Sequence, residues 1–215
     1  MKTVNFMMSL FFLFGLLLSC HKSAPEPNIA ATEYFPNTVG DYWEYEVNDS
    51  STVREHPEVS TPYTVKVSIV GHQSLIDGID ATIWQYEYPW GIDTNYIRIV
   101  NDTVKVFDLL YSRTLQDLQY PRILFIKPFV VDQRWDGKLT LIDTFHVYNA
   151  PSVITPTENF ENCFNIYHYY YGPNSKYTDN YWFKPNVGLV AIYTNHYDLA
   201  PRNIYLSRLK KYYLH

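Results

Sequence analysis

Seven histidines are the side chains of this 215-residue chain that could bind a metal or transfer a proton, and they are scattered along it: His21, His56, His72, His146, His168, His196 and His215. Three of them, His146, His168 and His196, fall in late segments with strand-like alternation. Three converging imidazoles would make a zinc site with an open coordination position. Single histidines in strands are usually ordinary polar positions, so we expect no metal site.

Pairs of carboxylates are the next candidates for chemistry, because two acids that flank a glycosidic bond can hydrolyse it. Asp77 with Asp80, and Glu158 with Glu161, are such pairs in sequence, but acids in ordinary loops have the same pattern. The chain contains no Gly-x-Ser-x-Gly motif and no His-x-x-x-His pair on a helical segment. We therefore predict a non-catalytic protein that uses no cofactor.

Cys20, one of only two cysteines, ends an apolar run near the N-terminus. Lys2 precedes the run, and residues 10–18 are apolar but too few to span a bilayer, which takes about 20 residues. Such a run has the length of the hydrophobic region of a signal peptide. Residues 17–20, Leu-Leu-Ser-Cys, resemble the bacterial lipobox, although Leu18 is bulkier than usual. The resemblance implies cleavage before Cys20 and acylation of its thiol; the alternative is an ordinary signal peptide.

Residues 21–33 are small and polar and include two prolines, which is typical of a flexible tether. Extended at ~3.1 Å per residue, they would reach roughly 40 Å from the membrane. In Bacteroidota-type lipoproteins, acids directly after the cysteine mark export to the cell surface, whereas the first acid here is Glu26. That resemblance favours the periplasmic side of the outer membrane. We divide the chain into a signal peptide (1–19), an acylated cysteine with its tether (20–33) and one domain (34–215).

Charge and cysteine content limit the possible partners. The net charge is −5, and loss of residues 1–19 removes one lysine and no acid, which gives −6. A negative chain does not favour nucleic acid or anionic membrane surfaces, so the lipid anchor is the expected attachment to the membrane.

With Cys20 acylated, Cys163 has no disulfide partner. Its position in a strand-like segment predicts a small buried residue rather than a reactive thiol.

Alternation of apolar and polar side chains with a period of two recurs along the domain, as at Val65, Val67 and Ile69. Turn residues separate the runs, for example Asp77-Gly78 and Asn101-Asp102. The pattern predicts about ten strands and little helix. The expected fold is therefore all-β, with a single antiparallel, strongly curved sheet or a half-open β-barrel.

Two segments of the sequence resemble those of a protein family. They are YFPNTVGDYWEYEV (34–47) and YWFKPNVGLVAIY (181–193), the second preceded by TPTENFENCFNIYH (155–168). Together they resemble a group of uncharacterised Bacteroidota outer-membrane lipoproteins, with a departure at residues 157–160. The resemblance implies a half-open β-barrel similar to Lol-type lipid-handling folds. Independently of the family, Gly40 and Gly188 stand where a positive φ or a close approach of the backbone is expected.

The aromatic content is high, with 21 tyrosines and five tryptophans. In the segment WQYEYPWG (84–91), Trp84, Tyr86 and Tyr88 share one face of a strand, because side chains alternate with period two. The opposite face is aliphatic and is the natural core side: Ile79, Ala81 and Ile83. We predict that the three aromatic residues line a groove or platform for a ligand.

A tyrosine-rich sheet face can have three different roles. The face can be exposed to solvent without aggregation, since tyrosine is amphipathic. It can line a cavity for an apolar or lipidic ligand, which is the function we expect. Alternatively, an exposed Tyr/Trp face can serve as a glycan- or protein-interaction module of the bacterial envelope.

Overall fold

The computed structural model describes residues 34–51, 56–108, 121, 123–137, 142–173, 175–197 and 204–215. Cys20, the signal peptide and the tether lie outside these ranges. The regular elements of the described residues are strands: β1 Tyr42–Asp49, β2 Tyr63–Ser74, β3 Asp80–Tyr88, β4 Gly91–Val100, β5 Thr103–Asp108, β6 Ile123–Ile126, β7 Arg134–Asp136, β8 Ile142–Ile154, β9 Asn159–Tyr171, β10 Lys176–Lys184, β11 Gly188–His196 and β12 Ile204–Tyr213. Among these residues, no helix is long and apolar enough to cross a membrane.

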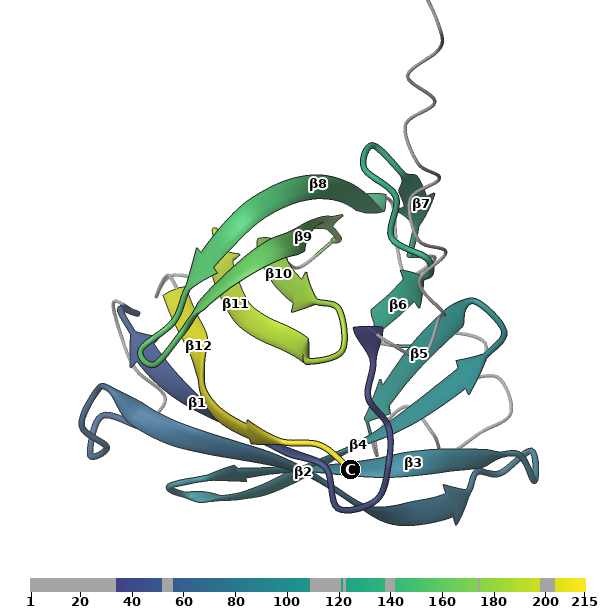
Figure 1. The fold of residues 1–215 in the computed structure, drawn as a ribbon, viewed down its shortest axis with the longest axis horizontal. Helices are drawn as coiled ribbons and strands as arrows, with labels where there is room; N and C mark the ends of the chain where they lie inside the picture. Colours follow the sequence, from purple (N-terminus) through teal and green to yellow (C-terminus); the bar gives the residue numbers. More distant parts are fainter. Residues whose placement is uncertain are drawn as a thin grey trace, which may run out of the picture.

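The strands form one antiparallel sheet in the order β6-β5-β4-β3-β2-β1-β12-β11-β10-β9-β8-β7. Strands that are neighbours in sequence pair with each other, except β6 and β7, which are the two edges of the sheet; β1 also pairs with β12 and so joins the two ends of the chain. The sheet curls into a nearly closed barrel (Figure 1). This confirms the predicted all-β, strongly curved antiparallel sheet; twelve strands are present where about ten were expected.

The edge strands β6 and β7 approach each other at the seam of the barrel. The indole Nε1 of Trp135 in β7 donates a hydrogen bond of 2.8 Å to the carbonyl of Leu124 in β6. Trp135 also stacks on Phe145 of β8, with ring centroids 5.2 Å apart. A side-chain contact therefore bridges the two edges that backbone pairing leaves open.

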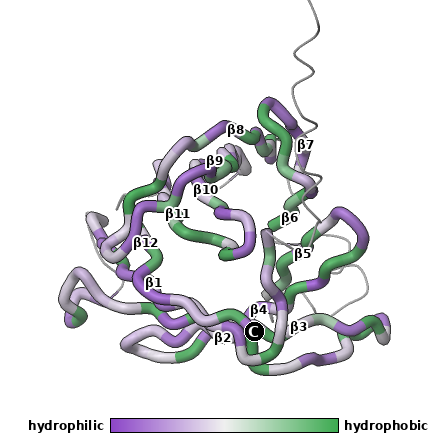
Figure 2. The backbone as a smooth tube through the Cα atoms, viewed as in Figure 1, coloured by the Kyte–Doolittle hydropathy of each residue, from purple (hydrophilic) through white to green (hydrophobic). Residues whose placement is uncertain are grey.

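The predicted alternation decides which side chains point inward. In β1, Trp43, Tyr45 and Val47 are buried and alternate with half-buried residues. The register pairs Trp43 with Val67 and Tyr45 with Val65, so both strands bury the same face. Figure 2 shows hydrophilic and hydrophobic residues interspersed along the strands, as a half-buried sheet requires. The expected alternation in β2 is confirmed.

The first described residues lie inside the barrel and not on its surface. Tyr34 and Phe35 are 1% and 7% exposed. The ring of Tyr34 lies 4.7 Å from that of Phe129, and the ring of Phe35 lies 4.8 Å from that of Phe183 in β10. This segment (purple in Figure 1) descends through the barrel before the chain turns into β1. The domain thus begins with aromatic side chains that are part of its core.

Gly188 is held at φ +92°, beside this N-terminal segment. A Cβ atom at this position would lie 3.2 Å from Cδ of Pro36 and 3.7 Å from Nε1 of Trp43. The Trp43 indole donates a hydrogen bond of 2.8 Å to the carbonyl of Val187, the preceding residue. Gly40 has φ +103°. Both expectations of positive φ at these glycines are confirmed.

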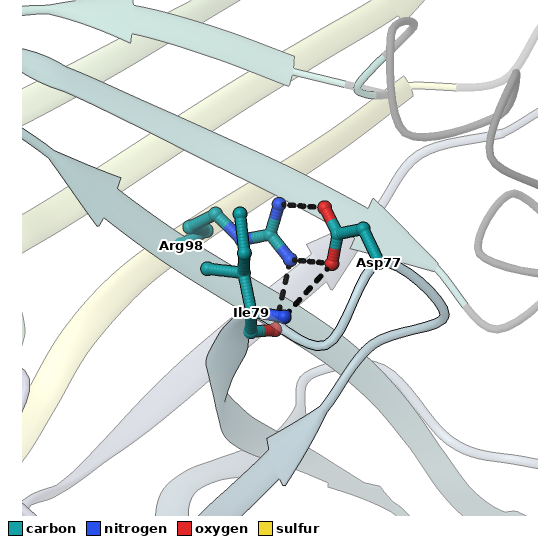
Figure 3. Close-up of polar contacts among 3 residues, drawn as sticks. All are labelled: Asp77, Ile79 and Arg98. Atoms are coloured by element: carbon teal, nitrogen blue, oxygen red, sulfur yellow. Dashed lines mark hydrogen bonds and ion pairs between the residues drawn. The ribbon is translucent and has the colours of Figure 1, made fainter.

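The β2–β3 turn is attached to the outside of β4 by an ion pair (Figure 3). The two carboxylate oxygens of Asp77 each lie 2.9 Å from a guanidinium nitrogen of Arg98, which also donates to the carbonyl of Ile79. Hydrogen bonding from Arg98 lowers the pKa of Asp77. Asp80 accepts a hydrogen bond from Ser74. The acids of the Asp77/Asp80 pair therefore have structural partners at a hairpin turn.

Candidate ligand-binding cavity

A cavity of about 600 Å³ lies inside the barrel. Its lining comes from residues 34–36, from β1 to β6 and from β9 to β12. Two clusters of the hydrophobic core contribute to its wall, one around Phe35, Phe125 and Phe183, the other around Trp43, Val65 and Val67. A volume of this size is within the range of small-molecule sites, about 300–1,000 Å³.

Aromatic side chains of β1 and β3 form one wall of the cavity. Trp84, Tyr86 and Tyr88 all line it, as do Trp43 and Tyr45. The Trp43 and Trp84 rings stack with centroids 5.1 Å apart and an interplanar angle of 15°. The Tyr45 hydroxyl donates a hydrogen bond of 2.8 Å to the carbonyl of Leu189, and burial raises the pKa of Tyr45 well above its usual value. These rings have fixed positions, which suits them to hold an apolar ligand.

Trp84, Tyr86 and Tyr88 therefore share one face of β3, as predicted, and their side chains point into the lumen. That these residues bind a ligand remains a prediction. The Trp84 ring also packs against both core clusters, and its Nε1 donates a hydrogen bond of 2.9 Å to Oδ1 of Asn37. Trp84 is thus part of the core as well as part of the cavity wall.

The expected core side of β3 is partly confirmed, because Ala81 is buried and Ile83 packs against the same small core cluster, but this side does not face the main interior of the barrel. Ile79 is 52% exposed, while Ala81 is buried in a small cluster on the outer face with Leu75, Tyr96 and Phe107. The barrel's main interior is on the aromatic side of the strand.

Trp90 lies at the rim of the cavity in a stack of aromatic rings. Its ring is 4.2 Å from that of His56 and 5.0 Å from that of Tyr88, with interplanar angles of 20° and 19°. Tyr63 contacts it edge-on at 5.2 Å. All four residues line the cavity, and Trp90 is 38% exposed. The aromatic wall therefore continues from the interior to solvent.

A carboxylate–imidazole–carboxylate cluster occupies the other side of the lumen. His168 of β9 is buried, with Nε2 at 2.7 Å from Oδ1 of Asp143 in β8. Its Nδ1 lies 3.5 Å from Oδ2 of Asp179 in β10, which also accepts a hydrogen bond of 2.9 Å from the Tyr181 hydroxyl. The imidazole stacks on Phe145 at a centroid distance of 4.0 Å. Cross-strand pairing brings these groups together, since His168 lies opposite both Phe145 and Asp179.

The charges of this cluster favour a protonated imidazole. Burial by itself lowers the pKa of His168, but hydrogen bonds and charge from Asp143 and Asp179 outweigh burial, so the pKa is raised above 6.5. Oδ1 of Asp179 is buried and has no hydrogen-bond partner. His168 and Asp179 are both lining residues of the cavity.

The three histidines considered for zinc do not converge. His168 and His196 both line the cavity, and their ring centroids lie 5.5 and 5.1 Å from the centroid of the Tyr177 ring. His146 alternates with the buried Phe145 and Val147 and lies 3.4 Å from Asp132. Within the described ranges, no group of three or more His, Cys, Asp or Glu side chains could hold a metal ion.

Sequence reasoning missed Asp143 and Asp179, the acids that make the cluster. The sequence does carry a signal for them. Asp143 lies two residues before Phe145, and Asp179 lies two residues before Tyr181, so each acid is on the same buried face of its strand as an aromatic residue. A carboxylate on an inward face needs a charged or polar partner. Glu158 and Glu161, in contrast, are exposed near the β8–β9 turn.

Cys163 is 1% exposed in β9 and packs in the core cluster around Trp43. Burial raises the pKa of its thiol to about 11. A thiol with this pKa is protonated at neutral pH and is a poor nucleophile. The prediction of a small buried residue is confirmed.

Comparison with known proteins finds similarity to solved structures but not to any sequence family. No protein-family model and no curated protein matches the sequence. A solved structure named a "putative lipoprotein", from Parabacteroides distasonis, is 14% identical with a TM-score of 0.45, over 84% of this chain and 98% of that chain. A "putative exported protein with YmcC-like fold" from Bacteroides fragilis is 12% identical with a TM-score of 0.44, over the same shares of the two chains. Likeness at this level assigns no function.

Proposed function

We propose that this protein is a lipid-anchored lipoprotein of the bacterial outer membrane, facing the periplasm, and that it binds an apolar or lipidic ligand inside its barrel without catalysing a reaction. The observation that carries the proposal is the cavity of about 600 Å³ with a wall of aromatic side chains. A core that served stability alone would be filled, because protein interiors are close-packed.

The cavity is large enough for a useful binding energy. Each buried CH₂ group contributes about 0.8 kcal/mol, so a twelve-carbon chain would contribute on the order of 9 kcal/mol. Association costs about 4 kcal/mol or more. With the lowest cost, the difference of about 5 kcal/mol corresponds to a dissociation constant on the order of 0.2 mM, and a higher cost weakens binding further, so a binding assay needs sub-millimolar to millimolar ligand.

The proposed anchor rests on the lipobox resemblance at Cys20. Two or three acyl chains hold a protein on a membrane far more firmly than one. The structure adds that Tyr34, directly after the tether, is packed in the core. A tether of residues 20–33 would therefore pull on a rigid point of the barrel and not on a loose end.

The absence of catalysis is proposed from the surroundings of His168. A general base needs one imidazole nitrogen free to take a proton from a nucleophile or water. Here Nε2 lies 2.7 Å from Asp143, and Nδ1 faces Asp179 at 3.5 Å. Because both nitrogens face carboxylates, the protonated form of the imidazole is favoured. An imidazolium has no nitrogen that can accept a further proton, so His168 is a poor general base.

A glycan- or protein-interaction module is the second candidate, and a ring pair on the outer surface favours it. Tyr42 and Tyr213 stack with centroids 5.9 Å apart, and Tyr213 is 51% exposed. Lys66 and Lys211 lie over the Tyr42 ring at 5.2 and 5.5 Å. The lysines occupy space over this ring that a sugar would need, so the internal cavity is the stronger site.

Native mass spectrometry of the mature chain with Cys20→Ser tests the proposal, because this variant needs no detergent. We expect an additional bound mass that organic extraction releases, or uptake of added dodecan-1-ol with one-to-one stoichiometry. A chain that carries no extra mass and takes up no alkyl compound would contradict the proposed function.

A further inference from the structure

The permanently charged groups of the cavity wall are carboxylates. Three carboxylates line it, those of Asp49, Asp93 and Asp179, together with the imidazoles of His56, His168 and His196. Within the described ranges, the lining includes no lysine and no arginine. The buried Lys127 lies over the Phe35 ring at 5.8 Å and is not a lining residue. An anionic ligand would therefore meet carboxylates without a permanently positive partner.

Asp179, a lining residue of the cavity, has an acceptor atom without a partner. The residue is 6% exposed, and its Oδ2 accepts from Tyr181 and faces His168. Its Oδ1 is buried without a hydrogen-bond partner. A buried carboxylate oxygen left unpaired is costly, so a donor from a ligand would be stabilised there.

The aromatic wall favours the same charge as Asp179. Rings of Trp43 and Trp84 line the cavity, and each has one face stacked on the other ring, which leaves one face of each to attract a cation. A carboxylate combined with aromatic rings is a suitable environment for an ammonium group, whereas a fatty-acid carboxylate is repelled by both. Apolar lining residues, including Val65, Val67 and Ile192, remain to hold the hydrocarbon part.

We propose that the ligand of this cavity is a cationic amphiphile, an alkyl compound with a primary amine, and that Asp179 accepts a hydrogen bond from its ammonium group. This inference rests on the proposed function, since it names the class of ligand for the same cavity. It predicts discrimination by head group between compounds with the same chain. A primary amine has a pKa near that of lysine, about 10, and is charged at neutral pH.

The test compares dodecylamine, dodecan-1-ol and dodecanoate, below their aggregation concentrations, by isothermal titration calorimetry on the mature Cys20→Ser chain at pH 7. We expect dodecylamine to bind best and dodecanoate worst. Asp179→Asn should weaken dodecylamine binding by about 10- to 100-fold, as expected for loss of a hydrogen bond between two charged groups, and should weaken dodecan-1-ol binding much less, because its hydroxyl is an uncharged donor.

A second variant keeps the test decisive if Asp179→Asn fails to fold. Thr194 pairs with Asp179 across β10 and β11 and also lines the cavity. Thr194→Lys places a cation beside the carboxylate and should reverse the preference toward dodecanoate. Ile142→Lys, at a position 43% exposed outside the cavity, is the matched control and should leave the order of affinities unchanged.

The outcomes separate the two proposals. Equal binding of the three compounds, or tighter binding of dodecanoate by the unmodified cavity, overturns the cationic ligand and leaves an apolar cavity in place. A loss of all three ligands to the same degree in a folded Asp179→Asn protein also overturns it. Failure of all three compounds to bind the unmodified cavity overturns the proposed function itself.

Discussion

Substitution of Gly188 separates the cost of its backbone conformation from the cost of its contact with the N-terminal segment. Gly188→Ala puts a Cβ at a φ of +92°, 3.2 Å from Pro36. Gly78→Ala has a comparable φ of +74° but meets nothing within 4 Å. Gly91→Ala has neither a positive φ nor a neighbour within 4 Å. The three glycines therefore form a graded series within one protein.

The magnitudes follow from these differences. Alanine at positive φ costs about 1–2 kcal/mol of unfolding free energy, which is the whole effect expected at Gly78. Crowding in a packed site adds about 1–3 kcal/mol, so Gly188→Ala should lose about 2–5 kcal/mol. Gly91→Ala should be neutral or gain up to about 1 kcal/mol, because alanine reduces the freedom of the unfolded chain. Gly188→Val should lose more than alanine does, since a β-branched side chain fits this φ even less well.

Urea unfolding of the mature Cys20→Ser chain, followed by tryptophan fluorescence, measures each free energy. Nε1 of Trp43 lies 3.7 Å from the position that the new Cβ would occupy, so this indole reports the site directly. If Gly188→Ala loses no more stability than Gly78→Ala, the packing of residues 34–36 against the β10–β11 turn contributes nothing, and the description of these residues as part of the core is refuted.

Three further predictions concern the anchor, the thiol and the buried histidine. Cys20→Ser should abolish labelling by a fatty-acid analogue in cells, because the thiol accepts the lipid; undiminished labelling contradicts the lipoprotein proposal. Cys163, with a pKa of about 11, should react with a thiol reagent only after unfolding, and rapid reaction of the folded protein would show that its burial is wrong. His168→Gln should cost most stability at low pH: the raised folded-state pKa of His168 gives a contribution that is complete below pH 6.5 and is lost as the pH rises through the folded value. Urea unfolding of both proteins between pH 5 and 9 checks this, and a difference that grows with pH would be the contrary result.

Local sequence patterns were sufficient for the strands and for part of the cavity wall. Alternation placed Val65, Val67 and Ile69 on one face, and the turn at Asp77-Gly78 was expected from its residue types. The common orientation of Trp84, Tyr86 and Tyr88 follows from strand geometry alone. These features depend on residues that are close in sequence, and a period of two is enough to predict them.

Features that depend on distant residues could not be predicted. Whether the aromatic or the aliphatic side of β3 faces the main interior of the barrel depends on how the whole sheet curls, and the sheet joins strands as distant in sequence as β1 and β12. Asp143 and Asp179 reach His168 only because β8, β9 and β10 are adjacent in the sheet. The place of Tyr34 inside the barrel, after a segment that resembles a tether, depends on packing against Phe129 and Phe164.

The most direct test of the ligand-binding proposal is to fill the cavity and measure binding. Ile192 of β11 lines the cavity and is half-buried, so Ile192→Trp should occupy part of the space that a ligand needs. Ile142→Trp adds the same ring at an exposed position outside the cavity. Calorimetric titration of both variants with dodecan-1-ol, together with their melting temperatures, compares a blocked and an open cavity. We predict loss of binding in Ile192→Trp with a folded barrel and unchanged binding in Ile142→Trp; equal binding by the two folded variants would show that the ligand does not enter the barrel.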